Sequence, residues 1–245
     1  MEFNKKEIIS VINRIFEKNG LSALLSAKKA EDLAALTEFL ISENEKYNLT
    51  AITEPSRIAL NHYADCAMLA KELPSGARIV DVGCGAGFPT LPIAILRPDV
   101  RITAIDSTAK RCAFVGSAAT LLGLENVTVT VARAEDAARE GALRESFDFA
   151  TARAVAEMRI LSELCLPFVR VGGKFIAMKG KNAENELRDA KRAIAMLGGR
   201  LSAVKAVSLI GEGEELSHPL IFIDKASRTP AAYPRAYAQI SKKPL

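Results

Sequence analysis

The sequence is poor in the residues that bind metals or form disulfide bonds. Its 245 residues include only two histidines and four cysteines, and no two cysteines form a CxxC pair. Structural zinc sites need clustered cysteine and histidine ligands, so we expect no metal site. Scattered cysteines are typical of intracellular chains, where they pack as small buried hydrophobic side chains.

Long apolar stretches are also missing. No segment approaches the roughly 20 apolar residues of a membrane-spanning helix. Charged residues interrupt every apolar run in residues 1–16, which is unlike a secretory signal peptide. We therefore expect a cytoplasmic protein with no membrane span. The length fits one or two domains and allows a large core without disulfide or metal support.

Acidic residues are absent from residues 225–245, which we call the basic strip. It carries five cations, whereas the whole chain has a net charge of +4, so the remainder is nearly neutral. The cations are Lys225, Arg228, Arg235, Lys242 and Lys243. A basic strip is an electrostatic footprint for nucleic acid, but it is equally typical of a solvated tail.

The hydrophobic pattern divides the chain into two parts, residues 1–73 and 74–245. Apolar residues at helical spacing predict helices in the first part, with one helix beginning at Pro55. In the second part, short apolar runs alternate with helical patterns. The predicted strands cover residues 78–82, 101–106, 126–132, 147–152, 172–180, 201–210 and 220–224.

Such alternation predicts an α/β fold with a mostly parallel, doubly wound, seven-stranded sheet and helices on both faces. No clear helix joins the last two strands, which therefore predict an antiparallel edge. The part before residue 74 is expected to pack on this core as a helical N-terminal part.

A glycine-rich turn, VDVGCGAGF at residues 80–88, follows the first predicted strand. Glycine tolerates the tight turn and lets a ligand approach the backbone. The GxGxxG spacing of dinucleotide sites fails because Phe88 and Thr90 stand where the third glycine would be. An acid before the turn, Asp81, and a second acid ending the next strand, Asp106, instead fit an S-adenosylmethionine site, in which Asp106 accepts both ribose hydroxyls.

Ligands of open α/β sheets bind at the carboxyl ends of the strands, so residues after the later strands are also candidates. The backbone of Ala134 and Glu135 can read the adenine edge, although Glu135 can instead cap the next helix. Arg153 can meet the cofactor carboxylate or an RNA phosphate, or it can be an exposed loop residue.

Groups needed for several methylation chemistries are missing at the fourth strand end. The segment ATARAVAE has no Asn-Pro-Pro-Tyr run, no nucleophilic cysteine and no histidine base. Guanine N7 has an exposed lone pair and no proton to lose, so its methylation needs no base. Transfer would then rest on in-line positioning, and we assign no catalytic residue.

These residues resemble the bacterial small-subunit ribosomal RNA guanine-N7 methyltransferase family, type G, also called glucose-inhibited division protein B. The resemblance extends over nearly the whole chain. Its segments are YNLTAIT (47–53), NHYADCAML (61–69), VDVGCGAGFPTLPIAI (80–95), TARAVA (151–156) and the ending Lys242-Lys243-Pro244-Leu245.

The resemblance implies a class I, Rossmann-like methyltransferase fold that modifies N7 of a guanine in the decoding-region loop of 16S ribosomal RNA. By matching position it implies cofactor contacts from Gly83, Phe88, Ala134, Glu135 and Arg153. Asn61, Cys66, Cys84 and Thr90 depart from the family pattern. Thr90 puts a β-branched residue at the start of the helix, and Asn61 removes a possible phosphate contact.

Together, the residues and the resemblance predict two sets of site residues. The cofactor set is Gly83, Gly85, Phe88, Asp106, Ala134, Glu135 and Arg153, and the RNA set is Arg235, Lys242 and Lys243. His62 is either a packing residue or part of the cofactor cleft. A non-catalytic RNA-binding assembly factor and an NAD-dependent oxidoreductase remain alternative functions, and we expect a monomer.

Overall fold

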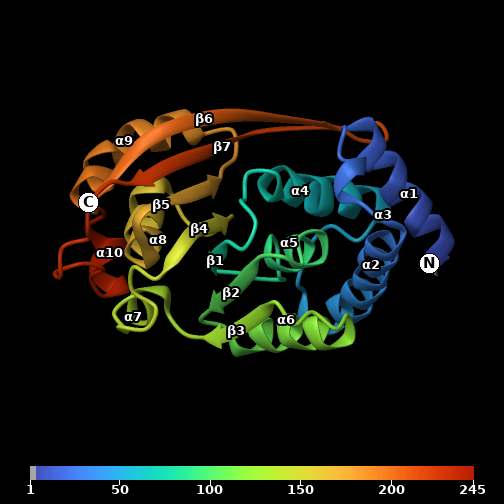
Figure 1. Cartoon of the computed structure of the whole chain (residues 1–245), viewed down its shortest axis with the longest axis horizontal. Helices are drawn as coiled ribbons and strands as arrows, with labels where there is room; N and C mark the ends of the chain where they lie inside the picture. Colours follow the sequence, from blue (N-terminus) through green and yellow to red (C-terminus); the bar gives the residue numbers. More distant parts are fainter. Residues whose placement is uncertain (1–3) are drawn as a thin grey trace.

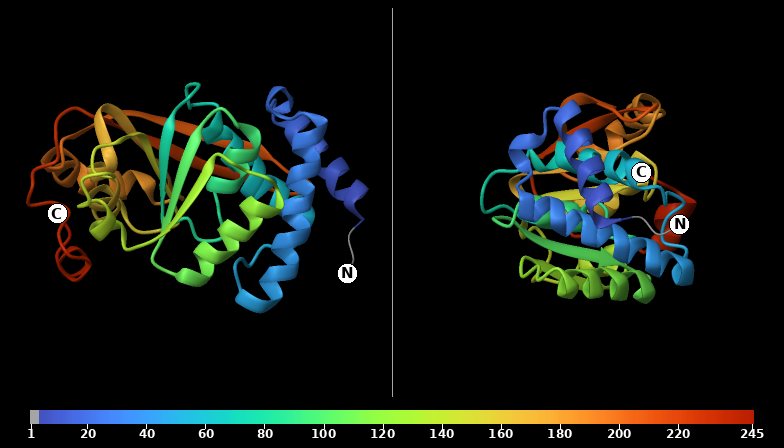
Figure 2. Two further views of the ribbon diagram at one scale, coloured as in Figure 1. Left: turned by 60° about the horizontal axis from the view of Figure 1, so that its bottom comes forward. Right: turned by 90° about the vertical axis from the view of Figure 1, so that its right-hand side faces the viewer.

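A seven-stranded sheet forms the centre of the computed structural model, which describes residues 4–245 (Figures 1 and 2). Its strands lie in the order β3-β2-β1-β4-β5-β7-β6. Their bounds are β1 (Arg78–Val82), β2 (Arg101–Asp106), β3 (Val127–Val131), β4 (Phe147–Arg153), β5 (Val169–Met178), β6 (Gly199–Ile210) and β7 (Glu215–Lys225).

The first five strands are parallel, and β7 pairs antiparallel with both β5 and β6. This confirms the predicted mostly parallel sheet with an antiparallel edge. The edge differs in one respect, because β7 inserts between β5 and β6 and leaves β6 outermost. Strands β6 and β7 are also longer than predicted, since many of their residues are exposed or polar and do not form an apolar run.

The N-terminal helices are α1 (Lys5–Lys18), α2 (Ala27–Tyr47), α3 (Pro55–Ile58), the π-helical η2 (Ala59–Ala64) and α4 (Asp65–Ala70), with a 3-10 turn, η1 (Ser22–Leu24), between the first two. Side chains of Asn4, Ser26 and Glu54 accept backbone N–H groups at the starts of α1, α2 and α3. The predicted helix from Pro55 is thus divided by a wide π-helical stretch, a feature often found at functional sites.

Helices cover both faces of the sheet. The face packed by α1–α4 is also covered by α5 (Thr90–Leu96) and α6 (Ala109–Leu121), and these helices share one hydrophobic core with the sheet. The other face is covered by α7 (Ala134–Ala137), α8 (Met158–Cys165), η3 (Leu166–Phe168), α9 (Ala183–Met196) and α10 (Tyr237–Lys242). The division into residues 1–73 and 74–245 stays a prediction, because both parts contribute side chains to the hydrophobic core on the α1–α6 face of the sheet.

The β6–β7 hairpin reaches across the molecule to the N-terminal helices (Figure 1). The Asn19 side chain donates to the Ile210 carbonyl at 3.0 Å and accepts from the Ile210 N–H at 2.8 Å. Near the tip, Arg14 pairs with Glu212, and the Asn61 amide donates to Glu214. The hairpin therefore fixes the position of α1 and η2 against the sheet.

The C-terminal segment corrects one sequence-based expectation. Lys225 belongs to the basic strip by sequence, but it is only 1% exposed. Its ammonium donates to the Leu166 carbonyl and the Thr229 hydroxyl and pairs with Glu145 at 3.2 Å. Burial lowers the pKa of Lys225 to about 8. This charge therefore joins the segment to the core, and it is not part of the surface footprint.

Candidate functional site

The glycine-rich turn joins β1 to α5 at the carboxyl edge of the sheet. Gly83 adopts a φ of +73°, and a Cβ there would lie 2.7 Å from a methyl carbon of Val155. The N–H groups of Gly83 and Cys84 both donate to the Ile105 carbonyl, at 2.8 and 3.1 Å. A side chain at residue 83 would therefore displace Val155 or open the turn away from β2.

A pocket of about 310 Å³ lies beside this turn. It gathers residues that follow four consecutive parallel strands, as the strand-end rule predicts. Four predicted cofactor residues line it, namely Gly83, Asp106, Ala134 and Glu135. Residues that were not predicted also line it, among them Arg111, Arg133, Val155, Leu164 and Tyr237.

Asp106 is the anchor of this pocket and is 5% exposed. One carboxylate oxygen accepts the Gly85 N–H at 3.0 Å, and the other accepts the Thr108 N–H at 2.8 Å. The Arg111 guanidinium lies 3.7 Å away. Gly85 thus contributes by fixing Asp106. Each oxygen keeps a further acceptor position, so two neighbouring hydroxyls can still bind.

Asp81 lies buried below the turn. One carboxylate oxygen, Oδ2, accepts the Thr90 hydroxyl at 2.6 Å, whereas Oδ1 has no hydrogen-bond partner within residues 4–245. Burial raises the pKa of Asp81 to about 6. The Thr151 hydroxyl, on the facing residue of β4, is likewise without a partner in the described chain. An unsatisfied buried carboxylate oxygen beside the turn fits a cationic ligand group.

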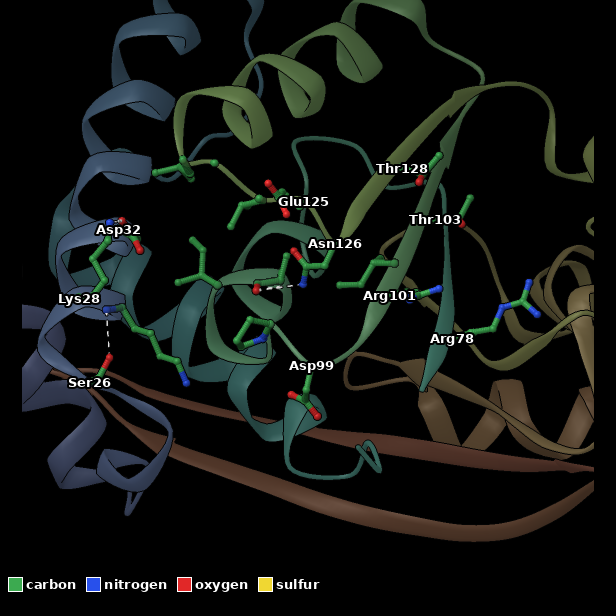
Figure 3. Close-up of a pocket in the computed structure, with 18 of the residues that line it drawn as sticks. Ser26, Lys28, Asp32, Arg78, Asp99, Arg101, Thr103, Glu125, Asn126 and Thr128 are labelled. Atoms are coloured by element: carbon green, nitrogen blue, oxygen red, sulfur yellow. Dashed lines mark hydrogen bonds and ion pairs between the residues drawn. The ribbon is translucent and has the colours of Figure 1, made fainter. Parts of the chain in front are cut away.

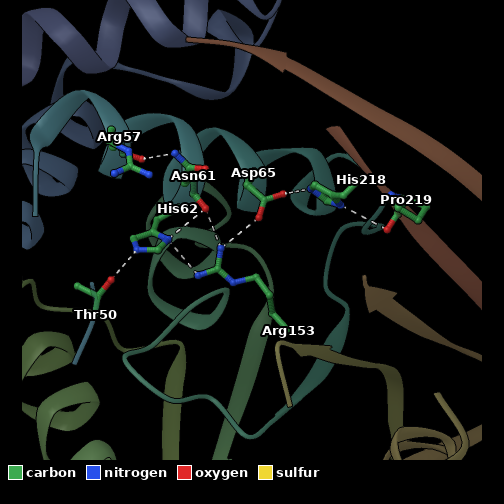
Figure 4. Close-up of polar contacts among 8 residues, drawn as sticks. All are labelled: Thr50, Arg57, Asn61, His62, Asp65, Arg153, His218 and Pro219. Carbon is green, nitrogen blue, oxygen red and sulfur yellow. Dashed lines mark hydrogen bonds and ion pairs between the residues drawn. The ribbon is translucent and has the colours of Figure 1, made fainter. Parts of the chain in front are cut away.

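Arg153 and Phe88 do not line this pocket. Figure 4 shows Arg153 pointing toward the N-terminal helices. Its guanidinium donates to the Asn61 carbonyl at 2.9 Å, pairs with Asp65 at 3.1 Å and lies 5.3 Å above the Phe88 ring. The prediction of a direct cofactor contact for these two residues stays a prediction, and in this structure both hold η2 and α4 against the sheet.

His62 belongs to the same group and is 7% exposed. Its ring stacks on Phe88 at 4.2 Å between centroids. The Nδ1 atom lies 3.2 Å from the Arg153 guanidinium and 3.1 Å from the Asn61 carbonyl, and Nε2 lies 3.3 Å from the Thr50 hydroxyl (Figure 4). Burial, and then the Arg153 charge, lower the pKa of His62 to about 3. His62 is therefore a neutral packing residue at pH 7, and not a proton acceptor for catalysis.

A second histidine extends this group to β7. The His218 ring lies 2.5 Å from Asp65, whose other oxygen holds Arg153. Burial alone would lower the pKa of His218, but the hydrogen bond and charge of Asp65 outweigh burial and raise it. Asp65 thus has one hydrogen-bonding partner on β4 and one on β7, which holds α4 over the carboxyl edge of the sheet.

A cavity of about 1080 Å³ lies at the opposite edge of the sheet, where strands β1–β3 begin (Figure 3). Its charged side chains come from α2, from the first residues of β1 and β2, and from the loops before β2 and β3. Lys28 pairs with Asp32 at its rim, and the Asn126 amide donates to three backbone carbonyls. None of the predicted site residues lies there, so its size does not identify the functional site.

The RNA set divides into two kinds of residue. Arg235 is held by Glu163, a carboxylate with no exposed surface, at 2.7 Å, and it also donates to the Lys243 carbonyl. Lys242 and Lys243 are exposed, and neither has a carboxylate partner in the described part of the chain. The structure therefore places Arg235 inside a structural ion pair and leaves the two lysines available at the surface.

The cysteines and acids show no metal-binding arrangement. All four cysteines are free and buried, and burial raises the pKa of Cys84 and Cys66. No group of three or more potential metal ligands occurs in residues 4–245. Within the same range, no helix is long and apolar enough to cross a membrane.

The sheet order, the glycine-rich turn and the acid ending β2 define a class I S-adenosylmethionine-dependent methyltransferase fold. A solved S-adenosylmethionine-dependent O-methyltransferase from Thermotoga maritima shares this fold, with a TM-score of 0.52 and 19% identity over 78% of this chain and 72% of that one.

The family follows from sequence comparison. Residues 29–212 match the family described as rRNA small subunit methyltransferase G. Ribosomal RNA small subunit methyltransferase G of Clostridium perfringens is 50% identical over 82% of this chain and 84% of its own length. The Clostridium beijerinckii protein of that name is 44% identical over 90% and 92%. The chain belongs to this family, which confirms the resemblance.

Proposed function

We propose that the protein transfers the methyl group of S-adenosylmethionine to N7 of a guanine in 16S ribosomal RNA, in the decoding-region loop of the small subunit. The observation that carries the proposal is the convergence of Gly83, Asp106, Ala134 and Glu135 on one pocket at the carboxyl edge of the sheet. Membership of the small-subunit methyltransferase family supports the RNA substrate.

The residues present fit this cofactor. Asp106 would offer two acceptor oxygens to the ribose hydroxyls, and the backbone of Ala134 and Glu135, which line the same pocket, would bind the adenine edge. The unpartnered Oδ1 of Asp81 suits the cofactor ammonium group. When bound, S-adenosylmethionine supplies an electrophilic methyl group on a positively charged sulfur.

The surrounding side chains suit a reaction without a base. His62 is neutral and buried, and the thiols of Cys66 and Cys84 have raised pKa values, so none of them is a ready nucleophile or proton acceptor. Guanine N7 needs neither, since its lone pair takes the methyl group directly. The protein then acts by holding the two reactants in line and excluding water.

A methyl-transfer assay tests the proposal. Purified protein is incubated with radiolabelled S-adenosylmethionine and either naked 16S RNA or small subunits from a strain lacking the enzyme, and N7-methylguanine is mapped. We expect label at a single guanine with wild-type protein. Asp106→Ala should bind the cofactor about 10- to 100-fold more weakly, because hydrogen bonds to a charged group are lost.

The alternatives predict different results. An RNA-binding assembly factor would bind the RNA equally with and without cofactor and transfer no label. A dinucleotide enzyme would bind NADH in a titration and ignore S-adenosylmethionine. Label that appears in 16S RNA at a position other than guanine N7 would keep the enzyme class but overturn the proposed target atom.

We propose a cytoplasmic location and a monomeric state as parts of the same function. The location follows from ribosomal RNA being the substrate in this proposal. Light scattering at micromolar concentration checks the monomer, and fractionation of cells checks the location.

A further inference from the structure

An aromatic side chain from the end of the chain lines the proposed cofactor pocket. Tyr237 is the first residue of α10, lies 131 residues beyond Asp106 in the sequence, and shares the same 310 Å³ pocket with it. The residue is 38% exposed, so part of its ring surface is uncovered. It contacts none of the groups that define the glycine-rich turn through a hydrogen bond or ion pair in the described residues.

Two sets of contacts hold this ring in place. The Arg133 guanidinium, next to Ala134 in the pocket lining, lies 5.1 Å from the ring centroid in a cation–π contact. After Tyr237 in the chain, Ile240 is fully buried in the core, and before it, Arg235 is anchored to the buried Glu163. The polypeptide on either side of Tyr237 is therefore fixed, which is unusual for a solvated tail.

The pocket has a polar side and an apolar side. Asp106 and the backbone of residues 133–135 offer hydrogen-bonding groups, whereas Leu164, Val155 and Tyr237 offer apolar surface. A purine needs both, because its edge forms hydrogen bonds and its faces stack on flat or apolar side chains.

We propose that Tyr237 is a cofactor-binding residue that packs its ring against the adenine of the bound nucleoside, so that the C-terminal segment forms one wall of the cofactor site. This rests on the proposed function, since it assumes that the pocket takes an adenosine-containing ligand. The end of the chain then has two roles, with Tyr237 in the pocket and the exposed Lys242 and Lys243 at the other end of α10.

Tyrosine fluorescence and binding titration test the assignment together. The chain has no tryptophan and only four tyrosines, so emission from Tyr237 is observable. S-adenosylmethionine is titrated into wild type, Tyr237→Ala and Tyr237→Phe, with affinity measured independently by calorimetry. Tyr47→Phe is the matched control, because Tyr47 is similarly exposed but ends α2, outside the pocket.

We expect Tyr237→Ala to weaken S-adenosylmethionine binding by roughly 5- to 20-fold. This is the low end of the effect of removing an aromatic side chain from a stacked base, because the Tyr237 ring is partly exposed. Tyr237→Phe should recover most of the affinity but lose the ligand-induced change in tyrosine emission. Tyr47→Phe should keep both. A Tyr237→Ala protein that binds as tightly as wild type, or a Tyr237→Phe protein that keeps the emission change, would overturn the assignment.

The Asp106→Ala variant distinguishes a failure of the Tyr237 assignment from a failure of the proposed function. If Asp106→Ala loses affinity and Tyr237→Ala does not, the pocket binds the cofactor without the C-terminal wall. If neither substitution affects binding, the pocket itself is misassigned and the proposed function fails with it.

Discussion

Replacing Arg235 by alanine should destabilise the whole protein, although sequence alone places this residue among the RNA contacts. Its backbone N–H, Nε and Nη2 reach Glu163 at 2.8, 2.9 and 2.7 Å, and the Glu163 side chain has no exposed surface. Arg235→Ala would leave a buried carboxylate with only the backbone N–H as partner.

The size of the effect follows from burial. Removing one partner of a buried ion pair costs about 3–5 kcal/mol, and the 22% exposure of Arg235 favours the lower end, about 3 kcal/mol. For a chain of this length that corresponds to a fall of roughly 6–12 °C in melting temperature. Urea unfolding followed by circular dichroism measures the free energy of unfolding directly.

A surface pair provides the matched control. Arg170 lies 2.7 Å from Asp148, the same distance as in the buried pair, but it is 52% exposed. Arg170→Ala should cost no more than about 1 kcal/mol. If Arg235→Ala costs less than that and mainly weakens RNA binding, then Arg235 acts on phosphate, and its assignment to a structural ion pair is wrong.

Three other changes have expected outcomes of a different kind. The double variant Lys242→Ala/Lys243→Ala should bind RNA more weakly and lower the salt slope of binding by up to about two phosphate contacts, measured by filter binding across salt concentrations; an unchanged slope would make these lysines a solvated tail. The Asp65 carboxylate raises the pKa of His218 despite burial, so the protonated His218 stabilises the fold fully below pH 6.5, and this stabilisation is lost as pH rises through the raised pKa. The difference in free energy of unfolding between wild type and His218→Gln should therefore shrink from pH 6 to 9. Thr90→Val removes the hydroxyl that donates a hydrogen bond to Asp81 and should lower the free energy of unfolding in urea by about 2 kcal/mol. The loss should be larger at pH 8 than at pH 5, because the hydrogen bond favours the charged form of a carboxyl group whose pKa is about 6. An equal loss at both pH values would contradict this.

Strands β1 and β2, at the centre of the parallel part of the sheet, could be predicted closely because most of their residues are buried. Their bounds are the predicted ones, 78–82 and 101–106, since a short, largely apolar run between turn residues leaves little choice of where the strand begins and ends. The strands of the β6–β7 hairpin are longer than predicted. Its outer half is stabilised by contacts to α1 and η2 that are distant in sequence, such as Asn19 with Ile210.

The site residues also divide into those fixed by the local sequence and those fixed by contacts distant in sequence. Gly83, Asp106, Ala134 and Glu135 could be found because each follows a parallel strand, and strand ends meet at one edge by topology alone. The direction in which the Arg153 side chain points could not be predicted, because it depends on Asp65, which lies on a helix 88 residues earlier in the chain. The place of Tyr237 in the pocket could not be predicted either, because the composition of residues 225–245 indicated only a positive charge and not how the segment packs.

Two segments from opposite ends of the chain meet the carboxyl edge of the sheet, and each is fixed there by a buried arginine–carboxylate pair. Arg153 with Asp65 holds the N-terminal helices, and Arg235 with Glu163 holds the C-terminal segment. Buried ion pairs add little net stability compared with apolar residues of similar size, because desolvation offsets the attraction. They do restrict geometry, since a guanidinium fork accepts few orientations of its carboxylate. Such restriction matters for segments that pack over the edge of a sheet without joining it as strands, because no ladder of strand-to-strand hydrogen bonds sets their orientation.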